Sequence, residues 1–131
     1  MNAIILPMPN SRIRIFTSVF RTRSNKLYLE NKESTRTMVN DRLKHFNTHY
    51  NLPVGRIAIR NQKSRWGSCS KKGNLNFNYK LAFLSPELRD YVIVHELCHV
   101  REFNHSKGFW ELVGETMPHW KKLRRELKNV K

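Results

Sequence analysis

The spacing of hydrophobic residues changes early in the chain. Across residues 12–20, β-branched and aromatic residues alternate or cluster, which predicts a β-strand, and residues 27–29 offer a short partner strand. From about residue 33 to residue 50, apolar residues recur every three or four positions among charged ones, which is the pattern of an amphipathic helix. We therefore expect a small N-terminal β-region within residues 1–30, followed by one helix.

Three shorter segments in the middle of the chain alternate between apolar and polar or small residues. Residues 57–60, 66–69 and 75–79 are expected to form strands on this basis. The sequence Ser-Lys-Lys-Gly-Asn at residues 70–74 separates the last two and has the composition of a turn. Together the segments predict a β-meander, in which consecutive strands pair in antiparallel.

The last third of the chain has the features of helices. Ser-Pro-Glu at residues 85–87 is a helix start, because Ser can cap free amide groups, Pro is tolerated at the first position and Glu favours the positive dipole end. We expect this helix to run to about Phe103, and its apolar stretch at residues 91–100 predicts a place in the core. Two further helices are predicted, one over residues 106–117 and one from Pro118 onward with a dense basic face.

Length and composition fit a single domain that spans residues 1–131. The 131 residues, 39% of them hydrophobic, are enough for one modest core. Cys69 and Cys98 are too few for a disulfide framework, so both are expected to be free thiols. The chain has no signal-like start and no apolar stretch long enough to span a bilayer. These features predict a cytoplasmic location and no membrane partner.

The chain is strongly basic. It has 25 Lys and Arg residues against 10 Asp and Glu residues, a formal net charge of +15. A surplus of this size creates a positive field that attracts polyanions, of which nucleic acid is the commonest. No base-reading motif accompanies the charge. DNA or another polyanion is therefore a possible partner that the sequence does not specify further.

One helical segment carries the strongest chemical signal. His95-Glu-Leu-Cys-His99 is the HExxH arrangement, in which two histidines four positions apart project from one helix face and can reach one zinc ion. Glu96 then lies beside the open metal position. Because the motif sits in an apolar helix, burying these polar groups without a metal or partners would cost several kcal/mol. We therefore expect His95 and His99 to be metal ligands.

A catalytic zinc needs a third protein ligand, since it keeps one position for water. His105 is our choice, because it follows the predicted helix end, where a reversal at Asn104 can bring the chain back over the metal. Glu102 and Glu111 are competing candidates, although Glu102 better suits a partner that orients a ligand histidine. We expect one Zn²⁺ per chain.

The expected chemistry is activation of water. The metal lowers the pKa of a bound water, Glu96 takes its proton as general base, and the same carboxyl can return a proton to the leaving amine. Arg65, Trp66 and Tyr79 are candidates for contacts with the substrate. The donor that stabilises the developing oxyanion is left open among Arg65, Tyr79, Tyr91 and His119.

Three motifs follow one another along the chain, namely Ser-Arg-Trp-Gly-Ser-Cys-Ser at residues 64–70, Tyr-Val-Ile-Val-His-Glu-Leu-Cys-His-Val at 91–100 and Asn-His-Ser-Lys-Gly-Phe-Trp at 104–110. Over about residues 56–120 they resemble the YgjP-like metallopeptidase family, which is related to the SprT-like and WLM metallopeptidases. The resemblance implies a minimal zincin-like α+β domain, with a small antiparallel sheet packed on the helix that carries HExxH. It also implies that the N-terminal β-region, residues 1–30, is shortened.

The resemblance implies a function as well as a fold. Zinc held by His95, His99 and His105, with Glu96 as the catalytic residue, would make the protein a metallopeptidase that hydrolyses peptide bonds in a protein or peptide. Two alternatives remain, a metal-dependent nucleoside triphosphate phosphohydrolase, as described for members of the family, and a nucleic-acid-binding module with a non-catalytic zinc. The chain has no Gly-rich phosphate-cradling loop, which disfavours a P-loop enzyme.

Overall fold

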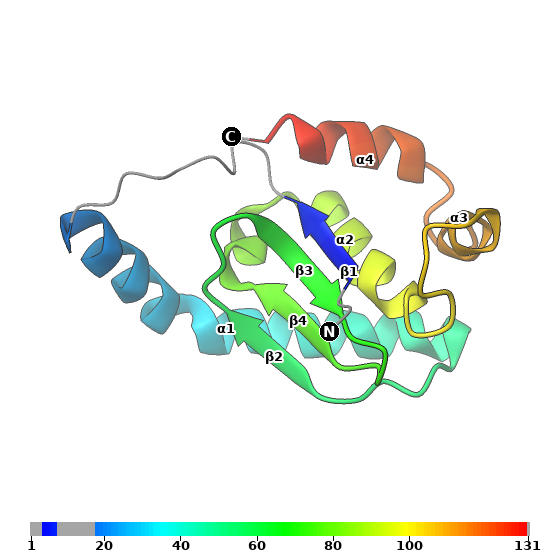
Figure 1. Cartoon of the computed structure of the whole chain (residues 1–131), viewed down its shortest axis with the longest axis horizontal. Helices are drawn as coiled ribbons and strands as arrows, with labels where there is room; N and C mark the ends of the chain where they lie inside the picture. Colours follow the sequence, from blue (N-terminus) through cyan, green and yellow to red (C-terminus); the bar gives the residue numbers. More distant parts are fainter. Residues whose placement is uncertain (1–3, 8–17, 131) are drawn as a thin grey trace.

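The computed structural model describes residues 4–7 and 18–130, and it has the α+β architecture that the sequence predicts (Figure 1). Helices α1 and α2 lie behind a small sheet in this view, while α4 runs along its upper margin. The elements are β1 (Ile4–Pro7), α1 (Ser18–Tyr50), β2 (Ile57–Arg60), β3 (Arg65–Cys69), β4 (Leu75–Asn78), the 3-10 helix η1 (Tyr79–Phe83), α2 (Pro86–Cys98), α3 (Lys107–Gly114) and α4 (Trp120–Lys128).

The sheet is mixed and has the strand order β1-β3-β4-β2. Strands β3 and β4 form the predicted antiparallel hairpin, whose turn places Gly73 at a φ of +82°, a conformation that favours glycine. Strand β2, however, pairs with β4 in parallel, so the predicted all-antiparallel meander is wrong. The Asn78 side chain donates hydrogen bonds to the carbonyls of Gln62 and Arg65. These bonds hold the β2–β3 connection at the end of β4. Strand β3 then pairs with the edge of β4 that is opposite to β2.

The N-terminal strands predicted from the hydrophobic pattern are also wrong where the structure describes them. Residues 18–20 and 27–29 belong to α1, while residues 12–17 lie outside the described part. Leu27 and Leu29 are exposed, 62% in the case of Leu29, because this end of the helix extends beyond the sheet (Figure 1). The alternation of apolar residues at positions 27–29 therefore belongs to a solvent-exposed part of the helix and does not indicate a strand. The strand that does form near the N-terminus is β1, which pairs with β3 in antiparallel.

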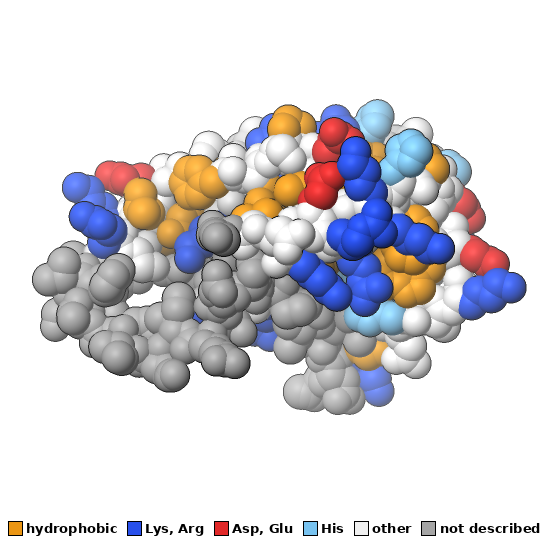
Figure 2. Space-filling model, turned by 90° about the horizontal axis from the view of Figure 1, so that it is seen from above, with side chains coloured by type: hydrophobic (Ala, Val, Ile, Leu, Met, Phe, Trp, Pro, Cys, Tyr) orange, Lys and Arg blue, Asp and Glu red, His pale blue; other side chains and the backbone are white. Residues whose placement is uncertain are grey.

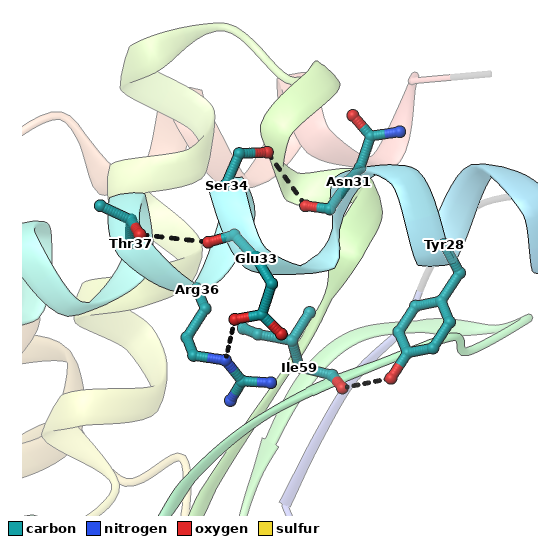
Figure 3. Close-up of polar contacts among 7 residues, drawn as sticks. All are labelled: Tyr28, Asn31, Glu33, Ser34, Arg36, Thr37 and Ile59. Atoms are coloured by element: carbon teal, nitrogen blue, oxygen red, sulfur yellow. Dashed lines mark hydrogen bonds and ion pairs between the residues drawn. The ribbon is translucent and has the colours of Figure 1, made fainter.

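Side chains of α1 fix it to the sheet and to α2. The Tyr28 hydroxyl donates a hydrogen bond of 3.1 Å to the Ile59 carbonyl in β2 (Figure 3). Farther along α1, the guanidinium of Arg42 binds both carboxylate oxygens of Asp90 in α2 at 3.0 Å. The predicted apolar stripe of α1, which runs from Val39 to Tyr50, packs into the hydrophobic core. The long helix thus supports both elements that carry the candidate site.

Helix α2 begins as the sequence predicts and ends earlier. The Ser85 hydroxyl accepts a hydrogen bond from the backbone N–H of Leu88, and Pro86 opens the helix. All residues from Tyr91 to Cys98 are buried, which confirms the predicted position in the core. The helix ends at Cys98, not near Phe103, because the backbone turns back immediately afterwards.

The two C-terminal helices are shorter than predicted. Ser106 caps α3 through its hydroxyl, which accepts from the Phe109 N–H. In α4 only Leu123 and Leu127 are buried, and the basic side chains face outward. The two cysteines are buried free thiols, as expected. Among residues 4–7 and 18–130, no helix combines the length and hydrophobicity needed to cross a membrane.

Candidate metal centre

Three histidines from two segments of the chain bring their ring nitrogens together. His95 and His99 lie one turn apart at the end of α2, and His105 comes from the loop before α3. The Nε2 atom of His105 lies 3.0 Å from Nε2 of His99 and 3.2 Å from Nε2 of His95. Within the described ranges this is the group of His, Cys, Asp and Glu residues with the geometry to hold a metal ion.

These separations fit a tetrahedral ion. Two nitrogens that each bind zinc at about 2.0–2.1 Å in tetrahedral geometry lie about 3.3 Å apart. The measured contacts of 3.0 and 3.2 Å are close to this value. A set of three imidazoles with a fourth position for water is also the donor set of a catalytic zinc site. The residues present therefore fit a zinc ion.

The histidines are held in the uncharged form that binds metals. Burial is the largest cause of a pKa lowered to about 3 for His95 and for His99, and of a pKa lowered to about 4 for His105. Nδ1 of His99 lies 2.9 Å from the carbonyl oxygen of Glu102, to which it can donate its proton. That hydrogen bond leaves the lone pair on Nε2, the atom that faces the other two rings.

Glu96 is a buried carboxylate with no hydrogen-bond partner among the described residues. Its side chain is 0% exposed, and one of its oxygens lies 3.4 Å from Nδ1 of His95, which also has no hydrogen-bond partner. Burial raises the pKa of Glu96 well above its usual range, while the nearby charge of Arg65 acts in the opposite direction. An unpartnered buried carboxyl costs several kcal/mol unless something binds it. Its position beside His95, one of the three converging histidines, thus points to a metal or an ordered water as the missing hydrogen-bond partner.

The loop after α2 returns His105 to the site. Hydrogen bonds from the N–H groups of Val100 and Arg101 to carbonyls three positions earlier tighten the chain directly after the helix. The reversal therefore starts before the predicted position at Asn104. Behind the histidines, the ring of Phe109 stacks on His99 with centroids 4.2 Å apart. Since Phe109 is fully buried, it fixes the plane of the His99 ring from the core side.

Beside the histidines the surface is hollowed by a cavity of about 90 Å³. Helices α2 and α4 form most of its wall, together with β1, the His105 loop and α3. The lining residues are Leu6, Tyr91, His95, His105, Trp110, Arg124, Leu127 and Lys128. Two of the three predicted ligands, His95 and His105, thus open onto a small space that a substrate group can enter.

The candidate substrate residues are placed differently from one another. Trp66 and Tyr79 are 4% and 1% exposed, so neither side chain presents a surface to a substrate, and for these two the prediction is not supported. The Tyr79 ring packs edge-on against Tyr28 of α1. Arg65 is half-buried, and its charge acts on Glu96. Of the three, only Arg65 is placed to influence the site.

Of the other candidate residues from the sequence, some lie at the site and others lie away from it. Tyr91 lines the cavity and its ring lies 5.8 Å from that of His95, whereas His119 is exposed at the start of α4 and does not line the cavity. Glu102 contributes its backbone carbonyl to His99, while its carboxylate lies near Gly108. Glu111 is exposed on α3, where its carboxylate pairs with Lys107 at 3.8 Å.

Sequence reasoning missed Gly67, which lies directly against the catalytic candidate. A Cβ atom at this position of β3 would lie 3.1 Å from Cγ of Glu96 and 3.0 Å from the carbonyl oxygen of Asn76. Glycine therefore lets the strand approach the carboxylate closely. The available signal was an isolated glycine inside a strand pattern, which often marks such an approach.

Comparisons with known proteins identify the family of the chain. The family described as YgjP-like, metallopeptidase domain, matches residues 18–130. The crystal structure of the metallopeptidase zymogen abylysin of Pyrococcus abyssi is similar, with 26% sequence identity and a TM-score of 0.55 over 67% of this chain and 90% of that chain. The search of curated proteins gave no match. On the family match over most of its length, the chain belongs to the YgjP-like metallopeptidase family.

Proposed function

We propose that this metallopeptidase is zinc-dependent and that it cleaves peptide bonds with Glu96 as general base. The observation that carries the proposal is the buried Glu96 carboxylate, which has no hydrogen-bond partner and lies next to His95, one of three converging imidazoles. A purely structural metal site has no need of such a carboxylate, because its ligands close the coordination sphere. A catalytic site needs a base next to the open position.

His95, His99 and His105 would hold the ion through Nε2. Zinc bound by three histidines supplies Lewis acidity, which polarises a carbonyl and makes a water ionise near neutral pH. The hydrogen bond from His99 to the Glu102 carbonyl keeps that ring in the ligand tautomer. Phe109 stacks on the same ring and restricts its rotation.

Glu96 moves the proton. One of its oxygens accepts the proton of the attacking water, and the resulting carboxylic acid donates it to the nitrogen of the leaving amine. Burial favours the protonated carboxyl, which makes Glu96 a competent acid in the second half of the reaction. Gly67 leaves room for the side chain at this point of β3. Arg65, whose charge acts on Glu96, is our candidate for a contact with the substrate.

Cleavage of an unfolded protein tests the proposal. Wild type and Glu96→Gln are incubated with fluorescently labelled casein, after the zinc content of both has been measured by elemental analysis. We expect wild type to cleave, and Glu96→Gln to keep its zinc and lose at least about a hundredfold in rate, the usual lower bound for loss of a general base. His119→Ala, which changes an exposed histidine outside the cavity, serves as the control and keeps full activity.

Two results would contradict the proposal. One is equal cleavage by wild type and Glu96→Gln, which would place the activity elsewhere or in a contaminant. The other is release of phosphate from nucleoside triphosphates that depends on Glu96 while casein stays intact, which would make the site a phosphohydrolase.

A further inference from the structure

Two cations share the cavity with the candidate metal ligands. Arg124 and Lys128 lie one turn apart on α4, and both line the hollow that His95 and His105 also line. The apolar wall between them and α2 includes Tyr91 and Leu127. This side of the cavity is therefore positively charged.

Neither cation has a negative partner in the part of the chain that the structure describes. Arg124 and Lys128 form no ion pair there, and the lining of the cavity includes no acidic residue. On the same helix, by contrast, Lys122 pairs with Glu126 at 3.8 Å. Like charges four positions apart on a helix repel by a few tenths of a kcal/mol. An anion bound between the two cations would offset this repulsion.

The Arg124 side chain is held in place by aromatic rings. Its guanidinium carbon lies 5.2 Å from the ring centroid of Trp110, within the range of a cation–π contact. Trp110 in turn stacks on His105, with centroids 5.7 Å apart, and on Trp120, with centroids 4.2 Å apart. A guanidinium stacked in this way keeps its N–H edge free for a planar acceptor. Arg124 is thus pre-oriented on the same stack of rings as the third predicted ligand.

We propose that Arg124, assisted by Lys128, binds a carboxylate of the substrate next to the bond that is cleaved. Arg binds carboxylates with two parallel hydrogen bonds, which gives both charge and geometric selectivity. A cavity of about 90 Å³ suits a carboxylate and the methylene groups that carry it. The inference rests on the proposed peptidase function and names its substrate class, which is peptides with an acidic side chain or a free C-terminal carboxylate at that position.

Arg124 and Lys128 belong to a broader basic surface, from which they differ by their place at the cavity. Figure 2 shows Lys and Arg side chains gathered over α4 with hydrophobic side chains between them. Lys121, Lys122 and Arg125 belong to this surface and line the open depression between α3 and α4, not the cavity at the histidines. A nucleic acid would use such spread charges along its backbone. Arg124 and Lys128 also border a hollow of this surface together with Lys121 and Arg125, but of these four cations only Arg124 and Lys128 line the cavity at His95 and His105.

Matched peptides test the proposal. Quenched fluorescent peptides derived from a casein cleavage site carry Glu or Gln at each position flanking the bond, and a second pair carries a C-terminal carboxylate or amide. We expect wild type to prefer one carboxylate-bearing peptide by about tenfold in kcat/KM, the ratio that corresponds to one charge-assisted contact. The Glu and Gln pairs report an acidic side chain, and the carboxylate and amide pair reports a C-terminal group.

Arg124→Gln should remove the preference for the carboxylate-bearing peptide. The ratio should fall to within about twofold of unity, because the loss in kcat/KM is larger for the charged peptide, which alone forms the ion pair, than for the neutral one. Arg125→Gln is the matched control, because it removes the same charge from the next position on α4, outside the cavity. It should keep the preference of wild type.

Binding to the Glu96→Gln variant separates failure of the inference from failure of the proposed function. Calorimetry with this variant should show tighter binding of the carboxylate-bearing peptide, and loss of that difference when Arg124→Gln is added. Cleavage without any preference, and equal binding of the two peptides, would overturn the inference and leave the peptidase standing. A single-stranded oligonucleotide that binds through Arg124 while peptides show no preference would overturn it in favour of nucleic acid. No cleavage of any peptide would refute the peptidase, and the binding data would still decide the role of Arg124.

Discussion

Helices α2 and α4 line the same cavity, yet they bury very different shares of their side chains. In α2 every residue from Tyr91 to Cys98 is buried, including His95 and Glu96. In α4 only two leucines are buried, and the side chains around them are basic and exposed. The candidate catalytic groups are therefore part of the hydrophobic core, whereas the groups proposed to select the substrate stand on its surface.

Because of this difference, substitutions in α2 and in α4 should affect the stability of the protein differently. Replacing a residue that packs against His95, Glu96 or His99 removes core contacts, so it should lower stability together with function. Replacing an exposed basic residue of α4 usually changes stability by less than about 0.5 kcal/mol, although replacing Arg124 also removes its contact with the Trp110 ring. Selectivity can thus vary on α4 without disturbing the catalytic groups.

Removing the ring behind His99 should have the largest effect on stability. Phe109→Ala leaves a cavity at a fully buried position, and such a change lowers the free energy of unfolding by about 3–5 kcal/mol. It also removes the stack that orients His99, so zinc affinity should fall. Chemical denaturation and zinc titration measure the two effects. Phe83→Ala, at a position that is 61% exposed, is the control and should change neither, and equal losses in both variants would contradict the buried role of Phe109.

Filling the space at Gly67 should have an intermediate effect. Gly67→Ala places a Cβ atom against Glu96 and the Asn76 carbonyl, and overpacking of this kind costs about 1–3 kcal/mol. Because the carboxylate must shift, kcat should fall while zinc content stays unchanged. Gly108→Ala is the matched control, since its new Cβ meets the flexible end of the Glu102 side chain and lies at ordinary contact distance, 3.7 Å, from the Ser106 hydroxyl. Unchanged kcat in Gly67→Ala would show that the approach of β3 does not position Glu96.

A single hydroxyl that ties α1 to α3 should have the smallest effect of the three. The Tyr50 hydroxyl donates to the Leu112 carbonyl at 2.7 Å and lies 2.8 Å from the Thr116 hydroxyl. Tyr50→Phe should lower the free energy of unfolding by about 1 kcal/mol, the usual value for one hydrogen bond, with zinc affinity unchanged. Tyr28→Phe, which loses a half-buried hydrogen bond of 3.1 Å, should lose less. The reverse order in denaturant titrations would contradict the deeper burial assigned to Tyr50.

The sequence predicts those parts of the fold whose periodicity reflects burial on one side. The hairpin of β3 and β4 and the capped start of α2 follow from alternation and from Ser85. The helical structure of residues 18–30 does not follow from the sequence pattern, because a helix that extends into solvent carries no apolar stripe. The exposed Leu27 and Leu29 are then spaced like the alternating residues of a strand. The parallel pairing of β2 with β4 is a non-local property, set by the crossing of the β2–β3 connection, and no local pattern encodes it.

In the candidate site, too, the sequence predicts what depends on local spacing and misses what depends on tertiary packing. The placement of His95, Glu96 and His99 follows from helical spacing alone, and the structure brings His105 to them as the sequence predicts. Gly67 and Arg124 come to the site only through packing of β3 and α4 against α2. Trp66 and Tyr79, which the sequence suggested as substrate contacts, are core residues. An aromatic residue near a motif can serve packing as well as binding.

Zinc content tests the central claim most directly, because His105 is the residue that joins the exposed loop to the buried pair on α2. Elemental analysis of wild type, His105→Ala and His119→Ala compares a predicted ligand with an exposed histidine that does not line the cavity. The three-histidine centre predicts about one zinc per chain in wild type and in His119→Ala, and a large loss in His105→Ala. Full zinc content in His105→Ala, or none in wild type protein supplied with zinc, would contradict it.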